Sequence, residues 1–276
     1  MPAADRRLFL TKPSQFQIKY SINAWMNPKN QVDLNEAQKQ WDSLYQAYQN
    51  LGTQVEVFEP LNGWPDSVFI GDSIFLYGQH AIASRFRYPE RSGEVQPIAA
   101  RFESRGYQVH TLPEGLFFEG NGDAVAWNDM VFAGHGVRSD RASLDFMSKT
   151  LGVSVVPIRL LPPHFHVDTC ICPLDDHTLA YVPSGMDEDS QEGVRALGAD
   201  LIEIDQEEAL LLACNSMAID RTLIISTPTA PKFNKELEKA NFDVLPLNLS
   251  EFAKSGGGAK CLTLEAYKSV IPSEGV

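Results

Sequence analysis

A cysteine close to the C-terminal end of the chain combines a reactive side chain with a glycine-rich approach. Cys261 directly follows the run Ser255-Gly256-Gly257-Gly258-Ala259-Lys260. Such an approach lets the backbone come close to a ligand and direct its N–H groups towards it. Those dipoles, together with a neighbouring imidazolium, favour the thiolate, which is the nucleophilic form of cysteine. Cys261 is therefore a candidate nucleophile, although a lone cysteine is as often a buried side chain at the start of a strand.

A histidine suited to acid–base chemistry lies far upstream of this cysteine. His166 and Asp168 belong to a run that also contains His164, Cys170 and Cys172. Strict alternation along a strand would place all five on one face, which raises the alternative of a zinc site. Same-face neighbours on a strand are about 7 Å apart, which is awkward for several ligands of one ion. An acid–base role for His166 together with Asp168 is therefore the favoured interpretation, and the zinc site is the alternative.

Several acidic residues lie in loops that could face a ligand. Glu119 begins the run Glu119-Gly120-Asn121-Gly122-Asp123, while Asp66 and Asp72 flank Phe69. Taken singly, such acids are usually solvated turn residues. Together with one histidine and one cysteine, they would form a pocket for a cation that a thiolate attacks. The guanidinium group fits such a pocket because its planar fork of donors matches carboxylates bidentately.

A fivefold repeat in the chain could bring these distant residues together. Segments with helical spacing end at Gly52, Gly106, Gly152, Gly198 and Asn241, and a short β-rich run follows each one. Glycine and asparagine tolerate the left-handed conformation that closes a helix. The spacings between these caps are 54, 46, 46 and 43 residues. A period of about 45 residues with internal strands predicts a propeller-like array, whereas a doubly wound α/β sheet is the alternative.

The repeat also predicts where the reactive side chains lie. Counted from its cap, Asp66 is at +14, Glu119 at +13, His166 at +14, Cys214 at +16 and Cys261 at +20. Equivalent positions in a radial array point to one end of its axis, so we expect these residues to converge. After each first strand we expect a loop and then a second β-rich stretch, at residues 67–76, 123–133, 166–182, 217–226 and 260–267.

Composition restricts the class of protein. With 276 residues, 43% hydrophobic and 21% charged, the chain is expected to form a globular protein with one catalytic domain over residues 1–276. The formal charge of −13 argues against a nucleic-acid partner and is compatible with a cationic substrate. No apolar run approaches the ~20 residues of a membrane helix, and the N-terminal residues do not read as a secretory signal. We therefore expect a cytoplasmic protein with four reduced cysteines and no membrane partner.

Four short motifs in this order and spacing resemble the guanidine-modifying pentein superfamily over residues 11–267. They are Pro65-Asp66-Ser67-Val68-Phe69, Glu119-Gly120-x-Gly122-Asp123, His166-x-Asp168-Thr169 and Gly256-Gly257-Gly258-Ala259-Lys260-Cys261. The superfamily includes dimethylarginine dimethylaminohydrolases, arginine deiminases, arginine dihydrolases and amidinotransferases. The resemblance implies an α/β fold, the pentein five-bladed α/β-propeller of ββαβ-like repeats with pseudo-fivefold symmetry, which agrees with the repeat above.

The resemblance implies roles for five residues. Cys261 would attack the guanidinium carbon, and His166 would protonate the departing amine and then activate water. Glu119 would hold the guanidinium group and pair with His166. Asp72 and Asp168 would each bind guanidinium nitrogens.

The resemblance further implies how the rest of the substrate is held. Asp66 and Phe69, in the first motif, would contact the substrate, and Arg91 and Arg138 would bind its carboxylate, a task that suits a bidentate side chain. Residues 23–31 would form a loop over the pocket, because the family uses an N-terminal loop there.

Departures from the family patterns bear on the choice of substrate. Methylarginine hydrolases usually carry an acid directly before the Asp72 position, where this chain has Gly71, and they generally lack the acid at the Asp168 position. Residues 166–174, 212–215 and 259–264 are most similar to ornithine-forming arginine dihydrolases, which have asparagine where this chain has Asp72. That exchange bears on whether a second C–N bond is cleaved.

We expect hydrolysis of a guanidinium C–N bond of L-arginine or an Nω-methylated arginine through a covalent thiouronium intermediate on Cys261. The products would be citrulline and ammonia or a methylamine, with no metal or organic cofactor. The alternatives are an arginine dihydrolase that yields ornithine, an amidinotransferase, and a catalytically silent binding protein. The expected partner is a small cationic guanidine compound, and a homodimer is the assembly considered, although no residue pattern fixes the oligomeric state.

Overall fold

Five helices end within three residues of the glycine or asparagine that the sequence marks as a cap. The computed structural model describes residues 6–226 and 230–268. The helices are α1 (Leu34–Asn50), α2 (Val95–Glu103), α3 (Arg141–Leu151), α4 (Glu188–Arg195) and α6 (Pro231–Lys239). The residues that close them all have positive φ: Gly52 (77°), Gly106 (88°), Gly152 (65°), Gly198 (71°) and Asn241 (59°). Because a Cβ atom makes this conformation costly and asparagine tolerates it best, the predicted caps are confirmed.

Each cap leads into the outer strand of a three-stranded unit. In every unit the first two strands pair antiparallel, and the third pairs with the second in parallel. The units are β3 (Ile74–Tyr77), β4 (His80–Ala83), β5 (Gln108–His110); β6 (Ala124–Trp127), β7 (Met130–His135), β8 (Ser154–Arg159); β9 (Ile171–Pro173), β10 (Thr178–Tyr181), β11 (Asp200–Glu203); β12 (Met217–Ile219), β13 (Thr222–Ile225), β14 (Asp243–Pro246); and β15 (Leu264–Tyr267), β1 (Arg7–Thr11), β2 (Gln54–Phe58). Two short helices, α5 (Gln206–Leu210) and α7 (Ser250–Ala253), complete the described helices.

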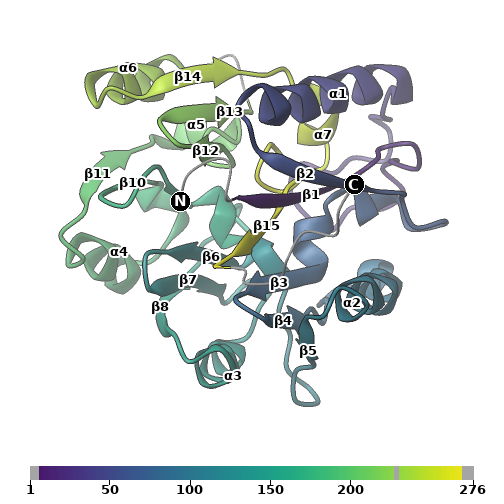
Figure 1. Ribbon diagram of the computed structural model, residues 1–276. Coiled ribbons are helices and arrows are strands. Elements are labelled where there is room, and N and C mark those ends of the chain that lie inside the picture. The colour runs from purple at the N-terminus through teal and green to yellow at the C-terminus, as the bar shows by residue number, and fades with distance from the viewer. Residues whose placement is uncertain (1–5, 227–229, 269–276) are drawn as a thin grey trace.

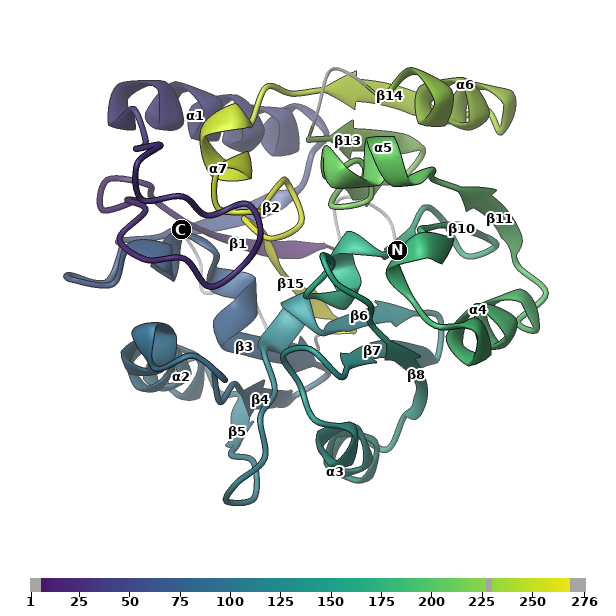
Figure 2. The same cartoon turned by 180° about the vertical axis from the view of Figure 1, so that it is seen from behind.

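The fifth unit joins the two ends of the described chain. Strand β15 pairs antiparallel with β1, so that Arg7 lies opposite Ala266 and Phe9 opposite Leu264. Strand β15 also pairs with β3, which merges the fifth and first units into one six-stranded sheet. Figures 1 and 2 show the units arranged around a common centre, with α1, α2, α3, α4 and α6 on the outside. The fold is the five-bladed α/β-propeller of the penteins, and the alternative of a doubly wound sheet is wrong.

Helix α1 shows how the outer helices cover the strands. Asp33 caps it by accepting hydrogen bonds from the backbone N–H groups of Asn35 and Glu36. Its apolar face, which includes Trp41 and Leu44, is buried, since these residues recur at helical spacing on the side that faces the core. On the same face the buried Tyr48 hydroxyl lies 2.7 Å from Thr263 Oγ1, which ties the helix to the segment that follows Cys261.

The turns before the inner strands differ from the prediction. Residues 67–76 and 166–182 were expected to be β-rich throughout, but strands begin only at Ile74 and Ile171. The preceding residues form single 3-10 turns at Pro65–Val68, Ile70–Ser73, Gly120–Gly122 and Val167–Thr169. A 3-10 turn brings residues three apart onto one side, whereas a strand would alternate them between two faces. The functional motifs therefore lie on turns that end in strands.

This correction removes the basis of the zinc alternative. His164, His166, Asp168, Cys170 and Cys172 do not share one strand face, because only Cys172 of the five belongs to a strand. Within residues 6–226 and 230–268, no three or more histidine, cysteine or acidic side chains are grouped so as to hold a metal ion. No helix in this described part of the chain combines the length and apolar character that a membrane crossing requires.

Candidate active site

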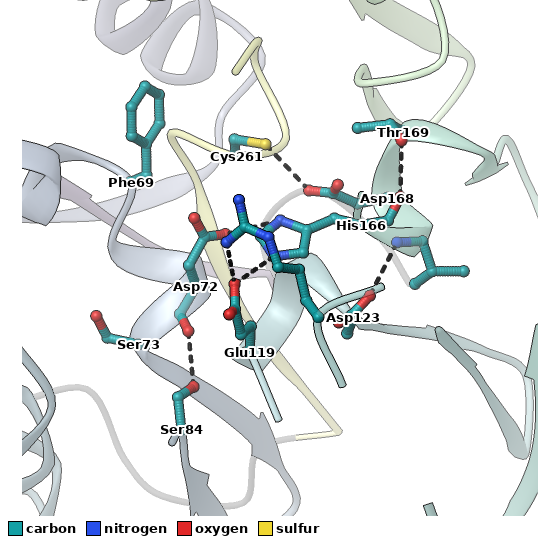
Figure 3. A network of polar contacts seen from close by, with 12 residues as sticks. Phe69, Asp72, Ser73, Ser84, Glu119, Asp123, His166, Asp168, Thr169 and Cys261 are labelled. Atoms are coloured by element: carbon teal, nitrogen blue, oxygen red, sulfur yellow. Dashed lines mark hydrogen bonds and ion pairs between the residues drawn. The ribbon is translucent and has the colours of Figure 1, made fainter. Parts of the chain in front are cut away.

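A small cavity lies where turns of several units and an N-terminal loop meet. It has a volume of about 20 Å³, and its lining residues come from widely separated parts of the chain: Ile22, Asn23, Met26, Asp66, Phe69, Asp72, Arg91, Arg138, Phe165, His166, Ser255, Gly256, Gly257 and Cys261. Seven of the nine site residues predicted from the sequence are among them. The other two, Glu119 and Asp168, join through contacts with His166 and Cys261 (Figure 3).

Cys261 lies in the turn that follows the glycine run and is only 4% exposed. Its Sγ donates a hydrogen bond to Asp168 Oδ2 at 3.3 Å and accepts one from Asn215 Nδ2 at 3.1 Å. Burial raises the pKa of the Cys261 thiol well above its ordinary value, and the nearby carboxylates of Asp168 and Asp72 raise it further. In the free protein Cys261 is therefore a thiol, and it needs a nearby positive charge to become a thiolate.

His166 and Glu119 form a buried ion pair beside this thiol. Nε2 of His166 lies 2.8 Å from Glu119 Oε2, and Nδ1 lies 3.8 Å from Asp72 Oδ1. Burial alone would lower the pKa of His166, but Asp72, the hydrogen bond with Glu119 and the charge of Asp123 raise it to about 9. Burial would raise the pKa of Glu119, but Arg138 and then His166 lower it to about 2. At neutral pH the pair is therefore an imidazolium and a carboxylate.

The two predicted carboxylate-binding arginines line the cavity and already bind acidic side chains of the protein. Arg138 Nη1 lies 2.8 Å from Glu119 Oε2, and its Nη2 donates to the carbonyl oxygen of Ile22. Arg91 donates to Asp72 through Nη1 and to both carboxylate oxygens of Glu94 through Nε and Nη2. Arg91 thus holds Asp72 in place, which is a contact that the sequence did not predict.

Three carboxylate oxygens at the cavity have no hydrogen-bond partner among the described residues. They are Oδ1 of Asp66, of Asp72 and of Asp168, and all three are buried. Nδ1 of His166 is buried and lacks a hydrogen bond as well. Buried polar atoms are nearly always hydrogen-bonded in folded proteins, so a group of unpaired acceptors around one thiol marks a binding site for a donor-rich cation.

Comparison with known proteins decides the family. The family model described as N,N dimethylarginine dimethylhydrolase, eukaryotic, matches residues 12–268. The chain belongs to this family. It is 36% identical over 263 residues to an N(G),N(G)-dimethylarginine dimethylaminohydrolase of Mycobacterium tuberculosis, covering 95% of this chain and 86% of that protein.

Members with a second activity are similar as well. The bifunctional arginine dihydrolase/ornithine cyclodeaminase ArgZ of Synechocystis is 34% identical over 276 residues, although the chain spans only 39% of that protein's length. The N-terminal domain of ArgZ, solved with a covalently bound reaction intermediate, superposes with a TM-score of 0.90 at 33% identity, covering 97% of this chain and 100% of that domain. The dimethylarginine dimethylaminohydrolase of Pseudomonas aeruginosa, solved with citrulline, shares the fold with a TM-score of 0.79 at 20% identity, over 94% of this chain and 98% of that one.

An N-terminal loop covers the cavity, as expected from the family resemblance. Ile22, Asn23 and Met26 line the cavity from this loop. Asn23 Nδ2 donates to the carbonyl oxygen of Ser255 at 2.9 Å, and Trp25 Nε1 donates to that of Leu210 at 3.1 Å. The loop thereby bridges to the glycine run before the nucleophile and lies over the cavity.

Glycines in the second motif make room for the ion pair. A Cβ atom on Gly122 would lie 2.6 Å from His166 Nδ1 and 2.9 Å from Asp72 Oδ1. Gly120 has a φ of +53°, and a Cβ there would lie 2.3 Å from the carbonyl oxygen of Gly71. The close approach of these turns therefore requires glycine, as the sequence indicated.

The prediction for the fourth repeat is off by one residue. Cys214, at +16, was expected to converge with the others, but it lies in the hydrophobic core, and burial raises its pKa well above the ordinary value. Its neighbour Asn215 contacts the Cys261 sulfur instead. Asn215 was not among the predicted site residues, since an amide does not titrate, although its place at +17 in the repeat was a signal that could have found it.

Proposed function

We propose that this protein hydrolyses one guanidinium C–N bond of L-arginine or an Nω-methylated arginine and releases citrulline with ammonia or a methylamine. The observation that carries the proposal is the set of buried carboxylate oxygens of Asp66, Asp72 and Asp168 that have no hydrogen-bond partner among the described residues and lie around the Cys261 thiol. A guanidinium group has a positive charge and up to five N–H donors in one plane, so it fits such acceptors better than an ammonium ion.

The charge balance of the site supports a cationic substrate. Six buried carboxyl groups lie in or beside the site together with the cationic side chains of Arg91, Arg138 and His166. They belong to Asp66, Asp72, Glu94, Glu119, Asp123 and Asp168. Burial, opposed in part by the nearby His166, raises the pKa of Asp123 and of Asp168 to about 7. A bound cation would favour the ionised form of these groups, so the excess of buried carboxyl groups over cationic side chains suits a cationic substrate.

The first step would form the covalent intermediate. A guanidinium group that binds Asp72 and Asp168 brings positive charge to Cys261. The thiol then passes its proton to Asp168 Oδ2, which already accepts a hydrogen bond from Sγ, and the sulfur attacks the guanidinium carbon. A C–S bond forms, and the C–N bond to the departing amine breaks after that nitrogen takes a proton from the imidazolium of His166. Nδ1 is the nitrogen suited to this transfer, because Nε2 is engaged by Glu119.

The second step would release the product. His166, now neutral, takes a proton from a water molecule, and the resulting hydroxide attacks the carbon of the thiouronium. The C–S bond breaks and the sulfur leaves as a thiolate, which regains its proton from Asp168. The product gives up the proton of its added hydroxyl group to solvent, which leaves neutral citrulline. Glu119 keeps the imidazole oriented and stabilises its charged form through both steps, as a carboxylate does in other nucleophile–histidine pairs. The sum is one guanidine and one water converted to one urea group and one amine.

Asp72 supports a single cleavage. After the first hydrolysis the ureido group is neutral, and an ionised carboxylate binds it less well than the cationic substrate. An asparagine, which both donates and accepts hydrogen bonds, would hold the neutral group for a second attack. The second candidate, an arginine dihydrolase yielding ornithine, is favoured by the similarity of the whole chain to the N-terminal domain of ArgZ.

The product assay separates these candidates. The purified protein and its Cys261→Ser variant are incubated with arginine, monomethylarginine and dimethylarginine, and citrulline, ornithine, ammonia and methylamines are quantified together. We expect citrulline with an equal amount of ammonia or of a methylamine from the wild type and essentially no product from Cys261→Ser. Ornithine as the main product would establish the dihydrolase, and full activity of Cys261→Ser would refute the covalent mechanism.

A further inference from the structure

A buried amide touches the sulfur that is proposed to react. Asn215 lies between α5 and β12 and is 0% exposed. Its Nδ2 lies 3.1 Å from Cys261 Sγ and 3.4 Å from the carbonyl oxygen of Asp168. Its Oδ1 accepts hydrogen bonds from the backbone N–H groups of Gly258 at 2.8 Å and of Cys261 at 3.2 Å. One side chain thus contacts the nucleophile, the loop that carries it and the turn of Asp168.

The orientation of this amide follows from its partners. A backbone N–H group can only donate, so the side-chain atom that faces Gly258 and Cys261 N must be the oxygen. The NH₂ group must then point towards the sulfur and the Asp168 carbonyl. Asn215 is therefore a hydrogen-bond donor to Sγ, and the opposite assignment would leave three mismatched contacts, with Gly258 N, Cys261 N and the carbonyl oxygen of Asp168.

The two polar neighbours of the Cys261 sulfur have opposite effects on the pKa of the thiol. Asp168 accepts a hydrogen bond from the thiol and so favours the protonated form, whereas an N–H donor binds a thiolate more strongly than a thiol. Of the groups that influence the pKa of the Cys261 thiol most, Asn215 lowers it while burial, Asp168 and Asp72 raise it. We infer that Asn215 is a catalytic residue that stabilises the anionic sulfur of Cys261, both when it attacks and when it leaves.

The surroundings hold Asn215 in this position independently of the sulfur. Ser226 Oγ donates to the carbonyl oxygen of Asn215 at 2.6 Å and accepts from the backbone N–H of Ala259 at 2.6 Å. A Cβ atom on Gly258 would lie 2.3 Å from Ser226 Oγ. Ser226 therefore supports the same loop without contacting the thiol, which makes Ser226→Ala a matched control.

The test measures the nucleophilicity of Cys261 rather than turnover. Asn215→Asp keeps an oxygen for Gly258 and Cys261 but removes the donor, and Asn215→Ala removes both. The alkylation rate of Cys261 by iodoacetamide is followed from pH 6 to 10 by mass spectrometry of the peptide that contains it, in the wild type, both variants and Ser226→Ala. Melting temperatures are recorded for all four proteins, so that alkylation is compared at a temperature where each is folded.

We expect the pH profile of the alkylation rate to shift upward by about one to two pH units in both Asn215 variants, since a hydrogen bond to a charged group is lost. The rate at pH 8 would fall about 10- to 100-fold, and kcat/KM would fall about 100-fold or more. Ser226→Ala should lower the melting temperature and leave the pH profile where it is. An unchanged profile in the Asn215 variants, or an equal shift in Ser226→Ala, would overturn the inference.

This inference rests on the proposed function in one respect, because it takes Cys261 as the reacting thiol. The two can fail separately. If Cys261→Ser retains full activity, the proposed mechanism fails whatever the alkylation data show. If Cys261→Ser is inactive and the Asn215 variants alkylate like the wild type, the mechanism stands and the role of Asn215 fails.

Discussion

At the scale of single residues, the charge of His166 depends on the acids around it. Asp72, Glu119 and Asp123 together hold the pKa of this buried imidazole at about 9 against the effect of burial. A general acid must carry its proton at the working pH, so this environment suits a residue that protonates a leaving amine. The same surroundings leave the imidazole ready to accept a proton from water once that transfer has occurred.

We predict that Glu119→Gln moves the alkaline limb of the pH profile to lower pH. Glutamine keeps the shape and an acceptor for His166 Nε2 but removes the negative charge, so the pKa of His166 falls and the imidazolium is lost earlier as pH rises. We also expect kcat to fall about 10²- to 10⁴-fold, as for other acid–base groups. The profile of kcat/KM between pH 5 and 10 tests this, and an alkaline limb at the wild-type position would count against the role of Glu119.

At the scale of elements, glycines have two different structural roles. Those that close the helices, such as Gly152, sit at positive φ with open space around them. Those in the turns before the inner strands, such as Gly122, are needed because the imidazole of His166 occupies the place of a side chain. The glycines that close helices therefore affect stability, whereas the glycines in the turns affect the geometry of the site.

This distinction predicts different outcomes for two alanine substitutions. Gly152→Ala should lower the free energy of unfolding by about 1–2 kcal/mol and retain kcat/KM, because its φ of +65° is unfavourable with a Cβ atom but nothing is displaced. Gly122→Ala should lower kcat/KM about 100-fold or more, since His166 must move. Urea unfolding and kinetics below the melting temperature of both variants measure the two effects. Equal losses of activity would contradict the assignment.

At the scale of the whole molecule, closure of the ring brings acidic side chains from several units together at one buried centre. Pairing of β15 with β1 and β3 closes this ring, so residues as distant in sequence as Asp72 and Cys261 are held together. Burial and the charge of Asp72 raise the pKa of Asp168, from 3.8 to about 7. The ionised carboxyl group of Asp168 therefore lowers the stability of the free protein, although the proposed function requires it.

We predict that Asp168→Asn stabilises the free protein at pH 8 while it abolishes turnover. A raised pKa means that the contribution of Asp168 to stability is fully present below its unfolded value of 3.8 and is lost as pH rises through about 7. Asparagine does not titrate, so the variant does not lose stability as pH rises. We expect its melting temperature at pH 8 to be higher by about 2–4 °C, which corresponds to roughly 1 kcal/mol in the free energy of unfolding.

Differential scanning fluorimetry at pH 5 and pH 8 provides the measurement, with Asp200→Asn, an exposed residue of β11, as the control. The gain should be larger at pH 8 than at pH 5, because the carboxyl group is still protonated at the lower pH. A variant that melts below the wild type at both pH values would show that Asp168 stabilises the fold.

The sequence by itself determined the features that depend on neighbours along the chain. Caps at Gly52 and Asn241, and the repeat that they mark, follow from conformational preferences of single residues, and these local preferences survive folding. The motifs around Glu119, His166 and Cys261 were recognisable for the same reason, since each is a short run with its own composition.

Tertiary structure alone decided which side chains meet. Whether Cys214 or Asn215 faces the nucleophile depends on the twist of one turn, and a shift of one residue reverses what is buried in the core and what reaches the site. The turns before the inner strands, the clamp of Arg91 on Asp72 and the raised pKa of His166 likewise arise from contacts between separate units. Such contacts depend on packing and on the burial of charged side chains from different units beside one another. No pattern within one segment of the chain encodes them.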